Sequence, residues 1–325
     1  MAANDGATFT EVEDFVAAVQ EARIELMVTS PGVFWARLTR VILPDLHLLA
    51  LSESLPRTAY IALSPERVCV AFPLDSDLSS VWGGVRLQRG HIVFHSRGEL
   101  FHQRTNGPTE WGLLLLEHKR LAAAGRALTG LNLALPPSGR ILRPARQDIV
   151  RLLRLHAAAA RFAHKQPKLI LDPEVIRALQ HDLVEAVVYC LASEGESDLG
   201  GWRRHKHVMD RFEHVLAAGP ARQMPMAELC SAIGVSERIL RSSCAEFLGI
   251  SPSRYLRLRR LRLAHIALRA GGSAPASVAE VARRYGFSEL GRFAGTYQAA
   301  FGETPSTTLQ RAKKNAPAKF FAGFG

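Results

Sequence analysis

The sequence lacks long apolar runs, and none approaches the ~20 residues that a helix needs to cross a bilayer. It also lacks an opening basic segment followed by an apolar one, so we expect no secretory leader. Cysteine is scarce: the four cysteines lie far apart without a C-x-x-C pair, which is typical of reduced, buried thiols. We therefore expect a cytoplasmic protein without membrane contact. The cysteines are Cys69, Cys190, Cys230 and Cys244.

The first 200 residues lack an excess of charge, with 21 lysines and arginines against 22 acidic residues. From Gly201 to the end there are 20 against 8, so the whole positive excess of the +11 chain lies in its last third. Such a balance is typical of a segment that meets a polyanion, because each neutralised phosphate releases counterions. A solvated basic face would give the same count, so charge locates a candidate segment without deciding its function.

A length of 325 residues suits two domains. Thr10 and Glu13 form a T-x-x-E capping box, which predicts an opening helix over Thr10–Glu21. From about Val33 to Glu117, short apolar runs broken by glycine and proline predict the closely spaced strands of a small antiparallel barrel or sandwich.

Helical periodicity returns over Arg146–His164 and Pro173–Ala192, where Asp172 is the expected N-cap. The polar, glycine-rich stretch Glu194–Gly201 then predicts a linker between domains.

Beyond this stretch the chain nearly repeats itself. Leu229–Glu237 aligns with Val281–Glu289 at an offset of 52, and Leu248–Ser253 aligns with Phe301–Ser306 at an offset of 53. One such pattern is also found in ordinary helical hairpins, but two copies with the same Gly-x-Ser/Thr-Pro-Ser ending indicate a duplicated unit.

Each copy has the residues that a helix-turn-helix needs. A small residue lies where two helices cross, and a glycine four residues later can take the positive φ of a tight turn. An apolar residue then fills the angle between the helices, and a serine is expected to cap the second helix. These residues are Cys230, Gly234, Val235 and Ser236 in the first copy, and Ala282, Gly286, Phe287 and Ser288 in the second.

An arginine-rich helix is predicted between the two copies, over Ser253–Arg269. We expect it to set their distance and to present arginines to phosphates. The arginines are Arg254, Arg257, Arg259, Arg260, Arg262 and Arg269.

The segment Trp202–Arg311 resembles the DNA-binding domain of the AraC/XylS family of bacterial transcription regulators, and Gly286–Phe293 is similar to its ethanolamine-operon branch. The resemblance implies seven helices, with recognition helices at Glu237–Phe247 and Glu289–Phe301 entering successive major-groove segments. It implies DNA contacts from Glu237, Arg238, Arg241 and Ser242 in the first helix, and from Leu290, Gly291, Arg292 and Gly295 in the second. The second set is less polar, so we expect it to grip the backbone mainly through Arg292.

The N-terminal half offers a possible metal site in His91, His95, His102 and Glu99. A cupin centre needs an H-x-H pair, whereas these histidines are four and seven residues apart, so we interpret them as ordinary histidines and predict no metal, cofactor or catalytic residue. The resemblance agrees, since it implies a degenerate barrel that senses rather than catalyses.

Other residues allow two interpretations each. Cys230 and Cys244 fall on core faces, where burial is expected rather than a redox switch. The tryptophans at 35, 82 and 111 are either core residues or the lining of a small-molecule pocket. The run Arg203–His207 begins a helix that either contacts phosphate or is solvated.

We therefore predict an α+β protein with a β-rich, degenerate cupin-like barrel and flanking helices in residues 1–198. An all-α domain of two helix-turn-helix units follows in 202–312, with a disordered tail in 313–325. The predicted function is a sequence-specific transcription regulator and activator, although the residues do not separate activation from repression. Its expected partners are double-stranded DNA with a bipartite operator, RNA polymerase, an unknown small-molecule effector and a second copy of the chain. The alternatives are a metal-dependent cupin-type enzyme fused to a DNA-binding domain and an architectural DNA-binding protein.

Overall fold

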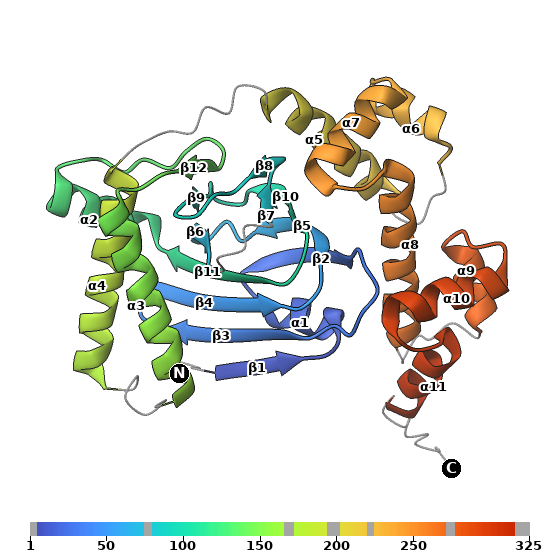
Figure 1. Ribbon diagram of the computed structural model, residues 1–325, viewed down its shortest axis with the longest axis horizontal. Helices are drawn as coiled ribbons and strands as arrows, with labels where there is room; N and C mark the ends of the chain where they lie inside the picture. Colours follow the sequence, from blue (N-terminus) through green and yellow to red (C-terminus); the bar gives the residue numbers. More distant parts are fainter. Residues whose placement is uncertain are drawn as a thin grey trace, which may run out of the picture. The chain divides into compact units, whose positions relative to one another are not determined.

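The computed structural model describes residues 5–74, 80–165, 172–193, 202–219, 224–270 and 277–315. The chain divides into two compact units, residues 1–203 without 30–32 and residues 204–325 together with 30–32 (Figure 1). The first is rich in strands and the second is helical, so the α+β prediction is confirmed. The predicted linker Glu194–Gly201 lies outside the described residues.

Unit one contains two antiparallel sheets rather than one closed sheet. The strand order is β1-β3-β4-β11-β6-β9-β12 in the seven-stranded sheet and β2-β5-β10-β7-β8 in the five-stranded sheet. This arrangement fits a degenerate barrel, because the described residues form no ladder between the two sheets. The strands are β1 Asp5–Phe9, β2 Ala22–Val28, β3 Ala36–Ile42, β4 Leu46–Glu53, β5 Arg57–Leu63, β6 Val68–Pro73, β7 Ser80–Trp82, β8 Val85–Arg86, β9 Ile92–Phe94, β10 Leu100–Thr105, β11 Thr109–Leu116 and β12 Arg140–Leu142.

Strand β11 shows how the larger sheet is buried on both faces. Side chains alternate along a strand, and Leu114 and Leu116 pack into the core shared with the helices. Trp111, Leu113 and Leu115 instead line a cavity whose walls also include residues of the five-stranded sheet. Unit one therefore has three layers: helices, the seven-stranded sheet and the five-stranded sheet.

The helices of unit one only partly follow the sequence prediction. The N-cap of α4 is Asp172 as expected, since its side chain accepts from the amide of Glu174 at 2.8 Å. The opening helix is shorter than predicted, and its N-cap Glu11 makes no side-chain cap bond, so the capping box with Thr10 was wrong. In the sequence, strand β1 precedes this helix and strand β2 follows it, so only the residues between the two strands can be helical. The helices are α1 Val12–Ala18, α2 His118–Thr129, α3 Arg146–Lys165 and α4 Pro173–Ala192.

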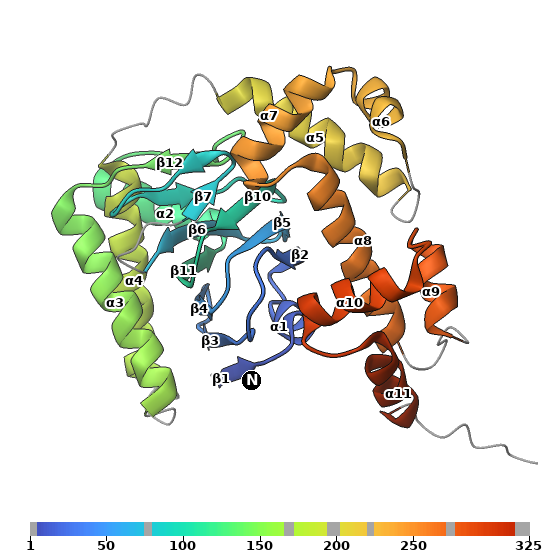
Figure 2. The ribbon, with the colours of Figure 1, turned by 45° about the vertical axis from the view of Figure 1, so that its right-hand side comes forward.

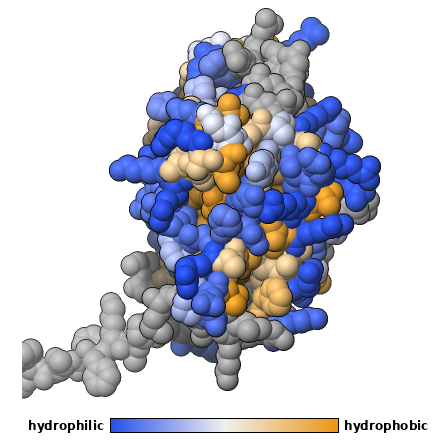
Figure 3. All heavy atoms as spheres, turned by 90° about the vertical axis from the view of Figure 1, so that its left-hand side faces the viewer, coloured by the Kyte–Doolittle hydropathy of each residue, from blue (hydrophilic) through white to orange (hydrophobic). Residues whose placement is uncertain are grey.

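Helices α3 and α4 pack against each other and against the larger sheet (Figure 1). The view onto the side of the molecule where these helices lie shows hydrophobic side chains interspersed with hydrophilic ones (Figure 3). Phe162 of α3 and Val175 of α4 are large apolar residues that remain exposed.

Unit two consists of helices, and α8 runs from the group α5–α7 to the group α9–α11 (Figure 2). Around the second group, residues of α8, α9, α10 and α11 share one core that includes Leu261, Val281, Phe293 and Leu309. Helix α11 includes Lys313–Asn315, so the predicted disordered tail does not begin at residue 313; residues 316–325 lie outside the described part. The helices are α5 Trp202–Ala218, α6 Met226–Ile233, α7 Glu237–Leu248, α8 Pro252–Arg269, α9 Val278–Arg284, α10 Leu290–Phe301 and α11 Pro305–Asn315.

Candidate nucleic-acid interface

The first helix-turn-helix unit consists of α6, a short turn and α7. Gly234 ends α6 with φ +73°, a conformation that a side chain would strain. The amides of Gly234 and Val235 both donate to the carbonyl of Cys230, at 2.9 and 3.0 Å. Ser236 then caps α7, because its hydroxyl accepts from the amide of Ile239. The turn therefore has the form expected from the sequence.

The second unit repeats the turn but not the cap. Gly286 has φ +81°, and the amide of Phe287 donates to the carbonyl of Ala282 at 2.8 Å, as Val235 does to Cys230. Helix α10, however, begins at Leu290 with Glu289 as its N-cap, and no side chain caps it. The predicted cap by Ser288 was therefore wrong. The second copy has one more residue after its turn, and this places the helix start one position beyond the reach of the serine.

Helix α8 holds the second turn in place through Arg260. Its Nη1 donates to the carbonyl of Gly286 at 3.3 Å, and its guanidinium lies 5.4 Å from the centre of the Phe287 ring. Burial and the neighbouring charge of Arg257 lower the pKa of Arg260. Arg260 therefore positions the turn. The sequence did not predict this role, because the partner, Gly286, is 26 residues away.

The expectation that α8 presents six arginines to phosphates was too broad. Arg254 and Arg257 are exposed, whereas Arg259 and Arg262 are buried in the unit. A buried guanidinium is engaged within the protein, so Arg259 and Arg262 are not expected to reach a phosphate backbone. The helical periodicity of α8 alternates exposed and buried arginines, which composition alone does not reveal.

A buried chain of hydrogen bonds fixes α10 against its neighbours. His265 Nδ1 of α8 lies 2.6 Å from the hydroxyl of Tyr297 in α10, which donates to Thr308 Oγ1 of α11 at 2.8 Å. Thr308 donates in turn to Glu303 Oε1 at 2.6 Å. Satisfied polar networks of this kind rigidify a core, so the buried face of α10 is held against α8 and α11.

The eight residues predicted to contact DNA are all exposed: Glu237, Arg238, Arg241 and Ser242 on α7, and Leu290, Gly291, Arg292 and Gly295 on α10. The structure thus brings each set together on one helix. Arg241 donates from Nε and Nη2 to Glu237 Oε1, at 2.9 and 2.5 Å. An exposed ion pair of this type contributes little free energy, so a guanine or phosphate can replace Glu237 at low cost.

The exposed face of α10 has few side chains, because it contains two glycines, Gly291 and Gly295. A Cβ built on Gly291 or Gly295 would meet no atom within 4 Å, so neither glycine is required by packing inside the unit. Arg292 is the only basic residue of α10, whose last turn contains none.

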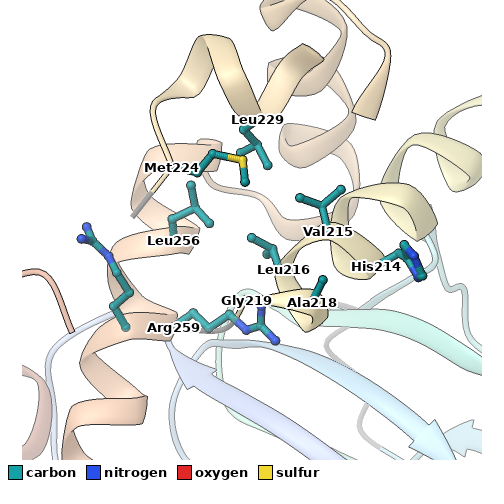
Figure 4. A pocket seen from close by; sticks show the side chains of 10 residues that line it. His214, Val215, Leu216, Ala218, Gly219, Met224, Leu229, Leu256 and Arg259 are labelled. Atoms are coloured by element: carbon teal, nitrogen blue, oxygen red, sulfur yellow. The ribbon is translucent and has the colours of Figure 1, made fainter. Parts of the chain in front are cut away.

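A pocket of about 410 Å³ lies elsewhere in this unit, between α5, α6 and α8 (Figure 4). Leu216, Met224, Leu229 and Leu256 gather at its centre, and Arg259 borders it. None of the eight predicted DNA contacts lines this pocket.

The histidines of unit one do not converge on a common point. His95 Nδ1 lies 2.8 Å from Glu99 Oε2, His91 Nε2 accepts from Arg143 at 2.7 Å, and the ring of His102 lies against Tyr60. In the part of the chain that the structure describes, no three His, Cys, Asp or Glu side chains are grouped to hold a metal. The metal-dependent enzyme therefore finds no support in this geometry.

The cavity between the sheets of unit one contains a charged pair that the sequence did not suggest. It has a volume of about 70 Å³ and mainly aliphatic walls. Arg57 and Glu53 form a buried ion pair in its wall, with Nε and Nη2 each 3.0 Å from the carboxylate. Trp111 lines it, as proposed, whereas Trp82 and Trp35 do not. The sequence signal for this pair was weak: Glu53 and Arg57 are charged residues at strand positions whose side chains face the interior.

All four cysteines are buried and unpaired. Burial raises the pKa of the Cys244 thiol to about 12, which disfavours the reactive thiolate. None of the described helices is long and apolar enough to cross a membrane.

Residues 229–311 match the helix-turn-helix domain family. The chain is 37% identical over 93 residues to the XylDLEGF operon transcriptional activator of Pseudomonas putida, and 36% identical over 95 residues to the probable thc operon regulatory protein of Rhodococcus erythropolis. Each match covers 29% of this chain and 29% of the relative, so the chain spans less than a third of the length of these curated relatives.

A solved structure, that of a probable AraC family transcriptional regulator from Rhodopseudomonas palustris, is 35% identical in sequence, with a TM-score of 0.31. The match covers 33% of this chain and 97% of that chain. Residues 229–311 therefore form a helix-turn-helix domain of the AraC/XylS type.

Proposed function

We propose that the protein is a sequence-specific regulator of transcription that binds double-stranded DNA with both helix-turn-helix units. The proposal rests on one observation: α7 and α10 each follow a tight glycine turn and expose the side chains that the resemblance assigns to DNA contact. The positive excess of the last third supplies the attraction to phosphate. A relative is named a transcriptional activator, so activation is the proposed direction.

Helix α7 is proposed to read bases directly. Arg238 and Arg241 are exposed and can each donate a bidentate pair to guanine O6 and N7. Ser242 lies on the same face, and Glu237 holds Arg241 until DNA replaces it. Together these four residues form the specific half of the site.

Helix α10 is proposed to bind mainly the DNA backbone. Arg292 is its strong donor, while Leu290, Gly291 and Gly295 offer no side-chain hydrogen bond. Contacts to phosphate fix register and orientation but carry little sequence information. The second half-site should therefore be less conserved among bound sequences than the first.

Unit one is proposed to bind a small-molecule effector, and its cavity between the two sheets supports this role. We also propose that the protein forms a homodimer, contacts RNA polymerase and acts in the cytoplasm. The exposed Phe162 and Val175 on the α3–α4 side offer apolar surface to a second copy. Light scattering of the purified chain measures the oligomeric state.

Selection of bound sequences from a random DNA pool tests the proposal with the full chain. We expect a bipartite motif whose halves lie about one helical turn, or ~10 bp, apart. No enrichment, or one motif too short to span two major-groove segments, would contradict it.

A further inference from the structure

Helices α7 and α10 can be compared residue by residue. Each is 12 residues long, they begin 53 residues apart in the chain, and each is followed by a glycine with positive φ. Their buried residues keep the same offset, since Leu240 corresponds to Phe293 and Cys244 to Tyr297. Equivalent residues of the two helices therefore have the same orientation relative to the core of their own unit.

The comparison draws attention to Ile239. Three of the four predicted DNA contacts of α10 correspond to predicted contacts of α7. The fourth, Arg292, corresponds to Ile239, which is not among them. Ile239 is 43% exposed, and Ser242, three residues further on, is its neighbour on the helix surface. If α10 reaches DNA with Arg292, α7 brings Ile239 to the equivalent place.

The helix itself does not require an exposed isoleucine at this position. The amide of Ile239 donates to Ser236 Oγ and its carbonyl accepts from Ser243 Oγ, bonds that any residue except proline would make. Isoleucine is also a weaker helix former than alanine. Among the described residues of unit two, large apolar side chains are exposed at Ile239, Leu290 and Ile266, and the first two lie on the proposed recognition helices.

An apolar side chain limits what Ile239 can recognise on DNA. A phosphate, or a donor or acceptor atom of a base edge, would lose hydration against it without gaining a hydrogen bond. The C5-methyl group of thymine is the apolar group that base pairs expose in the major groove. Contact between the two would remove apolar surface from water on both sides.

We propose that Ile239 contacts the methyl group of a thymine in the half-site of α7 and selects thymine at that position. This inference rests on the proposed DNA binding of unit two and adds a specificity-determining residue to it. The side chain of Arg292 is long enough to extend from the equivalent place to the DNA backbone, whereas the short side chain of Ile239 contacts only a group next to the helix. The two helices therefore recognise different parts of DNA from equivalent positions.

Replacement of single thymines by deoxyuridine tests the proposal, because it removes only the methyl group. The full chain first selects its site from a random DNA pool, and Arg241→Ala identifies the half-site of α7 as the half that loses base preference. Fluorescence anisotropy then measures binding of the selected duplex with deoxyuridine at one thymine at a time. Ile239→Ala removes the proposed contact. Ile266→Ala is the matched control, since Ile266 is an exposed isoleucine of α8, outside both recognition helices.

We expect deoxyuridine at one thymine of this half-site to weaken wild-type binding about four-fold, the ratio that corresponds to one buried methyl group. Ile239→Ala should lose this sensitivity and at least as much affinity for the thymine site. Ile266→Ala should keep both. Ile239→Val, which retains a β-branched apolar side chain, should stay sensitive. The wild-type measurement needs no variant, so the proposal is tested even if Ile239→Ala does not fold.

An α7 half-site without thymine would overturn the proposal. Wild-type binding that no single deoxyuridine weakens would overturn it as well, and so would a folded Ile239→Ala variant with the sensitivity of the wild type. Each of these results leaves the proposed function in place, because a bipartite motif is still selected. Absence of a selected motif, or of a half-site that Arg241→Ala relaxes, would instead count against the proposed function and the inference together.

Discussion

At the scale of single residues, the environment decides the role of each side chain more than its chemical type does. His156 of α3 is fully buried, and its Nε2 donates to the carbonyl of Leu49 at 2.9 Å. Burial lowers its pKa to about 4, although the bond to Leu49 opposes this. His156 is therefore neutral in the folded protein at pH values where a free histidine is largely charged.

His156 should make unit one less stable in mild acid. The unfolded chain takes up a proton near pH 6.5 and the folded chain only near pH 4, so stability is lost as the pH falls through this window. Between pH 8 and pH 5 the loss should be about 2 kcal/mol. Urea unfolding followed by tryptophan fluorescence measures it, since three of the four tryptophans, at positions 35, 82 and 111, lie among the strands of unit one.

His156→Gln should remove most of this pH dependence, because glutamine cannot titrate. His164→Gln, at an exposed position of the same helix, should keep it. Equal pH dependence in the wild type and in His156→Gln would show that another group is responsible.

At the scale of elements, the two helix-turn-helix units differ more than their sequences suggest. Both turns depend on a local requirement, a glycine with positive φ, and this is why Gly234 and Gly286 could be recognised from spacing alone. The caps differ because one inserted residue moves the start of α10. The first residue of a helix depends on a single position and is therefore hard to predict from sequence. The existence of a helix is easier to predict, because its apolar periodicity extends over several turns.

The caps should therefore respond differently to the same substitution. Ser236→Ala removes the acceptor for the amide of Ile239 and should destabilise the first unit by about 1 kcal/mol. Ser288→Ala removes no cap bond and should change stability by less than about 0.5 kcal/mol. Hydrogen–deuterium exchange of α7 and α10 measures each locally, and an equal effect at both positions would contradict the structure.

The bare face of α10 leads to a second prediction at this scale. Gly295→Ala should stabilise the helix by about 1 kcal/mol, because alanine is the better helix former and the added methyl group meets no atom. Gly302→Ala is the matched control: with φ +74° at the end of α10, it should destabilise instead. If Gly295→Ala destabilised the helix as well, the face would not be open.

At the scale of the whole molecule, the sequence predicted best those elements whose structure depends on residues close to them in the chain. The helical pairs, their turns and the β-rich first half follow local patterns. Strands β1, β2 and β12 were not predicted, because their sequences mix polar and apolar residues and the strands gain stability from pairing within the sheets. Helix α2 was not predicted either, and it packs against α4, which is distant in the sequence. The contact of Arg57 with Gln103, 46 residues away, could not be inferred for the same reason.

The uneven distribution of charge predicts a strong effect of salt. If the basic last third meets about six phosphates, DNA affinity should fall on the order of 10³-fold between 50 and 200 mM salt. Fluorescence anisotropy with a labelled duplex measures the slope. A nearly flat dependence would mean that phosphate contacts contribute little to binding.

The central claim is that two helices read two separate segments of one site. The most direct measurement is selection of bound sequences from a random DNA pool by the full chain and by Arg241→Ala and Arg292→Ala. Arg241→Ala should relax base preference in one half-site only, at a cost of about 1–3 kcal/mol for the lost guanine contact. Arg292→Ala should weaken binding through the other half with little change in sequence preference. If both substitutions changed the same few base pairs, or if neither changed binding, the account of two recognition helices would be wrong.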